Sequence, residues 1–369
     1  MEREQATKFI YDLLRALVAK KGSDLFITAG FPPAMKIDGR MTPVSQQALT
    51  AQHTSMLVRA VMNDKQAAEF EAKKECNFAI SPSGIGRFRV NAFVQQGRVG
   101  LVLRTITTTI PKFDDLGLPH VLKDVSMTKR GLVIFVGGTG SGKSTSLAAM
   151  IGHRNENSYG HIITIEDPVE YVHNHKGCVV THREVGVDCE SWHVALKNTL
   201  RQAPDVIMIG EIRDPETAQL ALRAALSGIL VFSTLHTQDS AGAIPRLMDM
   251  GLEPYLLASG IVGVIAQRLL RNICPDCKER VTYSADTLAK VGLTPDPGLV
   301  LHRGRGCVKC GDTGYRGRTG VMEILVIDDR IHALIRERAD SRQIKQAAVA
   351  VGMTTLMDDA LAKALFGQT

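Results

Sequence analysis

The stretch LVIFVGGTGSGKS, residues 132–144, decides the fold of most of this chain. Its first five residues form a continuous apolar run, which is typical of a strand buried on both faces of a parallel sheet. The remaining eight match the pattern G-x-x-x-x-G-K-[ST], and a helix-forming stretch at 145–151 follows. A glycine-rich loop between a buried strand and a helix is the setting in which this motif binds nucleotide phosphates. The sequence therefore predicts a P-loop nucleotide-binding domain.

The chemistry of phosphate binding explains the residue types in this loop. Glycines let backbone N–H groups turn toward a phosphate, and the amino terminus of the helix adds partial positive charge. We expect Lys143 to reach the β- and γ-phosphate oxygens and the Ser144 hydroxyl to ligate Mg²⁺. ATP and Mg²⁺ are therefore the predicted cofactors. The residues predicted to bind the nucleotide are Gly137, Gly138, Thr139, Gly140, Ser141, Gly142, Lys143, Ser144 and Thr145.

Further apolar runs after the phosphate loop indicate the rest of the sheet. They lie at 162–165, 206–209 and 230–235, with helical patterns between them. Alternating strands and helices predict a doubly wound α/β domain. The tail adds a strand at 321–327 and helical patterns at 328–338 and 341–365.

The residues before the phosphate loop have a different pattern of apolar and polar side chains. An amphipathic stretch near the amino terminus and a helical pattern over 50–72 are mixed with strand-like segments, which predicts a small α+β domain. The expected strands are 24–28, 34–37, 86–95 and 98–106. The predicted organisation is an amino-terminal domain at 1–106, a linker at 107–130 rich in threonine, proline and charge, and the ATPase domain at 131–369 with an insert at 271–318.

Polar side chains follow three of the predicted strands. In a parallel sheet the carboxyl ends of the strands face the ligand crevice, so these side chains should lie near the γ-phosphate. Glu211 is expected to orient and deprotonate the attacking water, although a surface glutamate before the next helix is the alternative. Glu166 is expected to hold Mg²⁺ through water. His236 could sense the γ-phosphate, relay a contact between subunits, or play a structural part.

The chain has seven cysteines, and four of them form two Cys-x-x-Cys pairs. An odd count with paired spacing favours a metal site over a disulfide framework. Four thiolates suit one tetrahedral Zn²⁺, and four protein ligands leave no open position, so we expect a structural site. The alternatives are free thiols or a redox pair. The predicted zinc ligands are Cys274, Cys277, Cys307 and Cys310.

Composition argues against several other classes of function. No apolar run reaches the roughly 18 residues that a membrane-spanning helix needs, and the amino terminus lacks the layout of a secretory signal, so we expect a cytoplasmic protein. A nucleic-acid translocating ATPase is the alternative, because the segment 268–318 is basic. Aromatic residues are only 5% of the chain, which leaves few platforms for base stacking, so no nucleic-acid partner is expected. A non-hydrolysing adaptor that binds nucleotide is a third class, against which Glu211 argues.

These elements, in this order, resemble the type II/IV secretion ATPase family, which powers type IV pili and type II secretion. The phosphate loop is followed by IEDPVE at 165–170, by a strand ending in Gly210-Glu211, and by STLHT at 233–237. The resemblance covers almost the whole chain. It implies a homohexamer, each subunit carrying an amino-terminal PAS-like domain on a RecA-like ATPase domain with ATP between the two. It also implies that Glu211 is the catalytic base and Glu166 the magnesium-associated acid.

The resemblance further implies that arginines of the small domain reach the phosphates, and Arg89 and Arg104 are the favoured candidates. ATP binding would then draw the two domains together, and closures around the ring would act on an inner-membrane platform protein, with paralogous ATPases as further partners. The protein would be cytoplasmic and peripheral at the inner membrane through that platform.

The resemblance is a mosaic. As far as residues 201–204 the sequence is similar to that of the pilus retraction ATPases, and from Glu211 onward it is similar to that of the extension and type II secretion ATPases. The direction of the motor therefore stays open. The family usually has Gly-His before the strand that ends at the second histidine, whereas this chain has Gly228-Ile229. Either Ile229 weakens coupling between subunits, or the first histidine is dispensable here; we hypothesise that Ile229 reduces the cooperativity of ATP hydrolysis.

Overall fold

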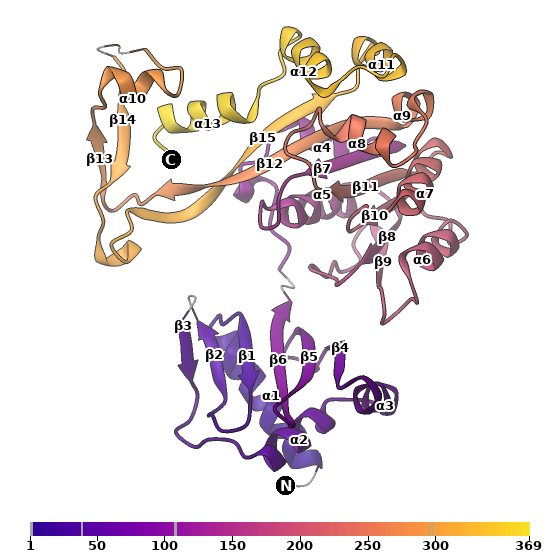
Figure 1. Ribbon diagram of the computed structural model, residues 1–369, viewed down its shortest axis with the longest axis vertical. Coiled ribbons are helices and arrows are strands. Elements are labelled where there is room, and N and C mark those ends of the chain that lie inside the picture. Colours follow the sequence, from indigo (N-terminus) through magenta and orange to yellow (C-terminus); the bar gives the residue numbers. More distant parts are fainter. Residues whose placement is uncertain (1–2, 38–39, 107–108, 295, 297) are drawn as a thin grey trace. The chain divides into compact units, whose positions relative to one another are not determined.

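The computed structural model describes residues 3–37, 40–106, 109–294, 296 and 298–369 (Figure 1). They form two compact units. The first contains the residues up to 110 together with 167–173 and 183–191, and the second contains 111–166, 174–182 and 192–369. The segment expected to be a linker contributes to the second unit from Pro111 onward, and its residues 107 and 108 lie outside the described part of the chain.

The first unit is an antiparallel sheet with helices on one face. Its strand order is β3-β2-β1-β6-β5-β4. The alternation of apolar and polar side chains along β5 explains why the helices cover one face of the sheet. Phe88, Val90 and Ala92 are buried against the helices, while Arg89 points to the other face. The elements are α1 (Arg3–Ala19), β1 (Asp24–Ile27), β2 (Ala34–Ile37), β3 (Arg40–Pro43), α2 (Ala51–Ala60), α3 (Asp64–Lys73), β4 (Glu75–Ile80), β5 (Arg87–Gln95) and β6 (Arg98–Ile106).

The predicted helix over 50–72 is wrong as a single helix. The chain leaves the first helix at Val61, and Asn63 then caps a second one by accepting a hydrogen bond from the backbone N–H of Gln66. The Gln66 side chain bonds back to the Asn63 N–H, which completes a capping box. The spacing of apolar residues stays helical across this break, so in the sequence only the capping residues indicate where one helix ends and the next begins.

The second unit is built on a seven-stranded sheet in the order β15-β12-β7-β11-β10-β8-β9 (Figure 1). The neighbours from β12 to β8 are parallel, and β15 is antiparallel to β12. The predicted α/β class with a parallel-rich sheet is therefore confirmed. The first elements of the unit are η1 (Asp114–Leu116), α4 (Val121–Ser126), β7 (Gly131–Val136), α5 (Lys143–Asn157), β8 (Gly160–Glu166), β9 (Cys178–Glu184), α6 (Trp192–Thr199), β10 (Val206–Ile209), α7 (Pro215–Leu226) and β11 (Leu230–Leu235).

Helices cover both faces of this sheet. On one face, Val133 and Phe135 of β7 pack with Leu147 and Met150 of α5. Ile134 points to the opposite face and is fully buried as well, where α7 packs against β7 and β11. Burial on both faces is why the central strands read as continuous apolar runs in the sequence.

The carboxy-terminal part extends the sheet and carries the cysteine pairs. Two helices, α12 and α13, replace the single helical pattern expected at 341–365, because Gly352 (φ +103°) breaks the run and Thr355 caps a new helix. The elements are α8 (Ala243–Asp249), α9 (Pro254–Gly260), β12 (Ile261–Ile273), β13 (Lys278–Val281), α10 (Ala285–Ala289), β14 (Leu301–Gly304), η2 (Val308–Cys310), β15 (Tyr315–Val326), α11 (Asp329–Arg336), α12 (Ser341–Ala350) and α13 (Leu356–Leu365).

No helix among the described residues combines the length and the apolar character that crossing a bilayer requires.

Candidate functional site

The carboxyl ends of four neighbouring strands lie along one edge of the seven-stranded sheet. The phosphate loop follows β7, His236 follows β11, Glu211 comes one residue beyond the glycine after β10, and Glu166 ends β8. The parallel registers align these ends, since Leu235 pairs with Val136 across β11 and β7, and Ile209 of β10 pairs with both neighbouring strands. The predicted phosphate, water and magnesium groups therefore all lie on the second unit.

The phosphate loop is anchored at its base and open at its tip. Gly137 and Ser141 are buried, whereas the tip residues Gly138 to Gly140 and also Ser144 are exposed. Lys143 starts helix α5, and its Nζ donates hydrogen bonds to the carbonyl oxygens of Gly137 (2.8 Å) and Gly138 (2.9 Å). The ammonium is thus held over the loop, where an oxyanion could replace the two carbonyls.

Electrostatics favour an anion beside Lys143. Burial lowers the pKa of Lys143, the nearby Arg268 guanidinium lowers it further, and Glu211 acts in the opposite direction. Lys143 and Arg268 place two cationic side chains by one glycine-rich loop, and a phosphate oxygen would relieve their mutual repulsion.

Strand β12 packs directly against the phosphate loop, a contact that sequence reasoning missed. A Cβ on Gly137 would lie 2.6 Å from both the Gln267 carbonyl oxygen and Arg268 Nη1, and one on Gly142 would lie 2.7 Å from Gln267 Nε2. These two glycines are required because β12 leaves no room for a side chain, and both have positive φ. The only sequence signal was a polar pair, Gln267 and Arg268, at the end of an apolar run.

Glu211 has two partners at the edge of the sheet. Arg213 Nη2 donates to Glu211 Oε1, and His236 Nε2 lies 3.4 Å from Glu211 Oε2. The hydrogen bond from Arg213 is the main reason that the pKa of Glu211 is lowered; burial opposes it, and the charges of Arg213 and His236 lower it further. Glu211 is therefore held as a carboxylate, the form that can accept a proton from water.

Glu166 is the more buried of the two carboxylates, with only 5% of its surface exposed. His182 of β9 lies close to it, with Nδ1 3.9 Å from Glu166 Oε1, and the same nitrogen is 2.8 Å from the Thr164 hydroxyl. The strand ends that carry Glu166 and Glu211 are joined by a hydrogen bond from the Gly210 N–H to the Ile165 carbonyl (2.8 Å). The two carboxylates thus belong to adjacent strand ends.

The two candidate arginines belong to the first unit. Arg89 of β5 and Arg104 of β6 are cross-strand partners. Arg104 Nε donates to Oδ1 of the buried Asp24 at 2.7 Å. Burial raises the pKa of Asp24, but the hydrogen bonds from Arg104 and Ser23 and the charge of Arg104 outweigh it and lower that pKa. Arg104 thus has a structural partner within its own sheet.

Ile229, the departure from the family pattern, lies at the other end of β11 from His236. Its carbonyl accepts a hydrogen bond from the N–H of Gly131, at the start of β7. The side chain at 229 is therefore separated from Glu211 by the six residues of β11.

The four paired cysteines meet in the insert. Their sulfur atoms all lie within 4.8 Å of one another, and the distances from Cys274 to Cys307 and from Cys277 to Cys310 are both 3.9 Å. Four sulfurs bound to one Zn²⁺ at about 2.3 Å would be about 3.8 Å apart. Burial raises the pKa of the Cys310 thiol, but hydrogen bonds from the backbone N–H groups of Cys307 and Gly314 outweigh it and lower that pKa, whereas burial raises the pKa of the neighbouring Cys277 thiol. The cluster is a metal-binding arrangement.

Comparison with known proteins places this site in a family. A family model described as "Type II/IV secretion system protein" matches residues 2–369. The chain belongs to this family. The type IV pilus ATPase PilU of Pseudomonas aeruginosa is 54% identical over 274 residues, which covers 73% of this chain and 71% of that protein. Type II secretion system protein E of the same organism is 43% identical over 249 residues, covering 67% of this chain and 49% of that protein.

A solved structure extends the family likeness to the fold. The crystal structure of the pilus retraction motor PilT with bound ADP matches with a TM-score of 0.75 and 34% identity, covering 96% of both chains. The predicted family is therefore confirmed. The predicted enzyme class, an ATPase, and the predicted function, a motor ATPase for a pilus or a secretion system, are confirmed by the same relatives.

Proposed function

We propose that this chain is the subunit of a hexameric motor in which Lys143 grips ATP and Glu211 activates the attacking water. The observation that carries the proposal is the meeting of Lys143, Glu211 and His236 at one sheet edge, where Glu211 is close enough to Lys143 to affect its pKa. A carboxylate beside a phosphate-binding lysine can serve hydrolysis, whereas a protein that only binds nucleotide does not need it.

Two side chains hold the Glu211 carboxylate in place. Arg213 donates a hydrogen bond to Oε1, and His236 lies beside Oε2. A water between Oε2 and the γ-phosphate would be oriented by the carboxylate and lose its proton to it during attack. His236, which lies beside the base, would then also be near the γ-phosphate, and we propose that it senses the phosphate.

Magnesium and the remaining loop residues complete the proposal. Ser144 is exposed at the start of α5 and offers its hydroxyl to Mg²⁺, and Glu166 offers a buried carboxylate from the end of β8. A metal held by these two residues would offset the negative charge of the bound phosphates. The loop from Gly137 to Thr145 would supply backbone N–H groups to the phosphates.

The assembly is proposed from the family. We propose a homohexamer whose subunits combine a PAS-like domain with a RecA-like ATPase domain, and in which Arg89 and Arg104 approach the nucleotide on closure. The motor would work on the cytoplasmic side of the inner membrane through a platform protein, alongside paralogous ATPases. The relative with 54% identity is a type IV pilus ATPase, which makes pilus dynamics the favoured task and type II secretion the alternative. No nucleic-acid partner is proposed.

The cysteine cluster is proposed as a structural zinc site. Its spacing suits a tetrahedral ion, and Cys277 and Cys274 are buried in the described structure. The ion would join β12 to the loop before β15, because Cys274 and Cys277 follow β12 while Cys307 and Cys310 precede β15.

Substitution of Glu211 tests the function. We expect Glu211→Gln to bind ATP normally and to hydrolyse it at least about 100-fold more slowly, because the general base is lost while the shape is kept. Glu216→Gln is the matched control, since Glu216 is 64% exposed and pairs with His193 on the surface. Steady-state hydrolysis and nucleotide binding should both be measured. Equal turnover by Glu211→Gln and the unaltered protein would show that the base is assigned wrongly.

The task in the cell is tested by deletion in the host. Hyperpiliated cells would indicate a retraction motor, cells without pili an extension motor, and normal pili with lost protein release a secretion motor. Stimulation of hydrolysis by DNA with a steep salt dependence would instead favour a nucleic-acid motor.

A further inference from the structure

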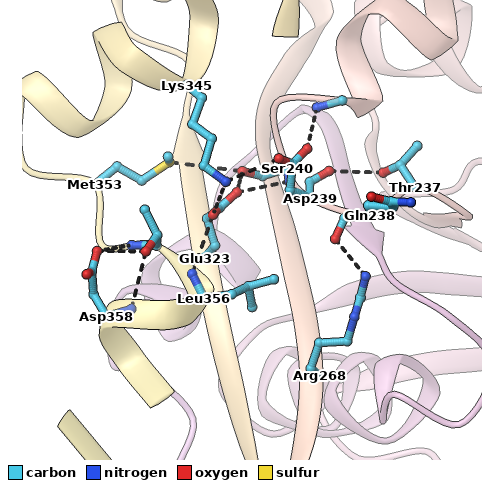
Figure 2. Close-up of polar contacts among 12 residues, drawn as sticks. Thr237, Gln238, Asp239, Ser240, Arg268, Glu323, Lys345, Met353, Leu356 and Asp358 are labelled. Atoms are coloured by element: carbon cyan, nitrogen blue, oxygen red, sulfur yellow. Dashed lines mark hydrogen bonds and ion pairs between the residues drawn. The ribbon is translucent and has the colours of Figure 1, made fainter. Parts of the chain in front are cut away.

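The loop from Thr237 to Ser240, here called the β11–α8 loop, begins at the candidate active site. It follows His236, which lies beside Glu211. Its Gln238 carbonyl accepts a hydrogen bond from Arg268 Nη2 at 2.6 Å (Figure 2). Arg268 is the residue of β12 whose Nη1 would touch a Cβ on Gly137. The loop is therefore linked to the phosphate loop through Arg268 and to the proposed base, Glu211, through His236.

The far end of the same loop is fixed to the carboxy-terminal part of the chain. Ser240 donates to Oε1 of Glu323 twice, from its hydroxyl at 2.5 Å and from its backbone N–H at 3.1 Å (Figure 2). Lys345 of α12 bridges two acidic groups, with Nζ 3.2 Å from Asp239 Oδ2 and 3.2 Å from Glu323 Oε2. The backbone N–H of Leu356, the first residue of α13, points at the same Oε2.

These buried contacts restrict the position of the loop more strictly than a surface ion pair would. Glu323 of β15 is completely buried, and a buried carboxylate is stable only where donors surround it. Burial lowers the pKa of Lys345, but its contacts with Asp239 and Glu323 outweigh that effect and raise it. Asp239 is also tied to its own loop, because its Oδ1 accepts from the Gly242 N–H at 2.9 Å. The position of the loop is therefore set by α12 and β15 through charged groups, which tolerate little displacement.

We propose that Glu323 and Lys345 are positioning residues for ATP hydrolysis: they hold the β11–α8 loop and, through it, His236 and Arg268 in place at the nucleotide site. The inference rests on the proposed function, since it concerns turnover at that site. It makes hydrolysis depend on where α12 lies.

The test compares two charge-removing variants of α12. Lys345→Met removes the bridging ammonium, and Arg342→Met removes an exposed charge one turn earlier on the same helix. Displacement of reacting groups by about 1 Å can cost about 100-fold in rate, so we expect Lys345→Met to lower kcat by about 10-fold or more while KM for ATP changes less than about twofold. Arg342→Met should match the unaltered protein. Lys345→Arg, which keeps the charge, should recover most of the rate.

A second variant guards against simple misfolding. Asp239→Asn keeps the acceptor for Gly242 and leaves the Glu323–Lys345 pair intact, so it loosens only the tie between the loop and α12. We expect a smaller fall in kcat with an unchanged melting temperature. If the unaltered protein is active and both Lys345→Met and Asp239→Asn keep its kcat, the positioning role is wrong. If the unaltered protein hydrolyses no ATP, the proposed function itself fails, and this inference with it.

Discussion

Replacing Gly137 by alanine tests how tightly the phosphate loop is packed against β12. The added Cβ would lie 2.6 Å from the Gln267 carbonyl oxygen and 2.7 Å from Ser141 Oγ, at a φ of +149°. The carbonyl belongs to a central strand and cannot move aside as a flexible side chain could. A residue held at such a φ costs about 1–3 kcal/mol, and overpacking adds about 1–3 kcal/mol. We therefore expect Gly137→Ala to destabilise the second unit by about 2–6 kcal/mol.

The neighbouring glycine provides a matched control. A Cβ on Gly138 would meet nothing within 4 Å, and its φ is not in the left-handed region. Gly138→Ala should therefore change stability by less than about 0.5 kcal/mol. One kcal/mol shifts the melting temperature of a unit of this size by about 2–4 °C, so Gly137→Ala should melt at least about 4 °C lower. Thermal unfolding of purified protein measures both variants. Equal melting temperatures would refute the close packing of β12 on the loop.

Three further predictions concern the metal, the base and the family departure. Freshly purified reduced protein should contain one Zn²⁺ per chain, and Cys307→Ser should lose the metal and melt at a lower temperature; finding no metal in the unaltered protein would contradict this. Arg213→Met should raise the pKa of Glu211, because the hydrogen bond that lowers it is lost. Glu211 is then protonated at a higher pH, so the acidic limb of the plot of kcat against pH should move to higher pH. An acidic limb at the same pH as in the unaltered protein would count against Glu211 as the base. Ile229→His should raise the Hill coefficient for ATP, and an unchanged coefficient would end that hypothesis.

Local signals made the centre of the fold predictable from sequence. The strands β7, β10 and β11 are short apolar runs buried on both faces, and each reads as a strand without knowledge of its neighbours. The order of parallel strands then places Glu211 and His236 near the phosphate loop, because all carboxyl ends lie at one edge. The cysteine pairs likewise carry their spacing in the sequence.

Long-range packing was not predictable in the same way. Nothing local shows that Gln267 and Arg268 lie against Gly137, about 130 residues earlier in the chain. The same holds for Glu323, an isolated acid in a strand, whose partners Ser240 and Lys345 come from two other elements. Breaks within helical patterns, such as the one at Asn63, depend on capping hydrogen bonds that periodicity does not register.

In the proposed mechanism Lys143 holds the triphosphate while Glu211 activates the attacking water. The most direct test is ATP turnover by purified Lys143→Ala, measured beside Lys123→Ala, whose lysine pairs with Asp114 outside the site. We expect Lys143→Ala to lose nucleotide binding and turnover while Lys123→Ala keeps both. Hydrolysis by Lys143→Ala at the rate of the unaltered protein would contradict it.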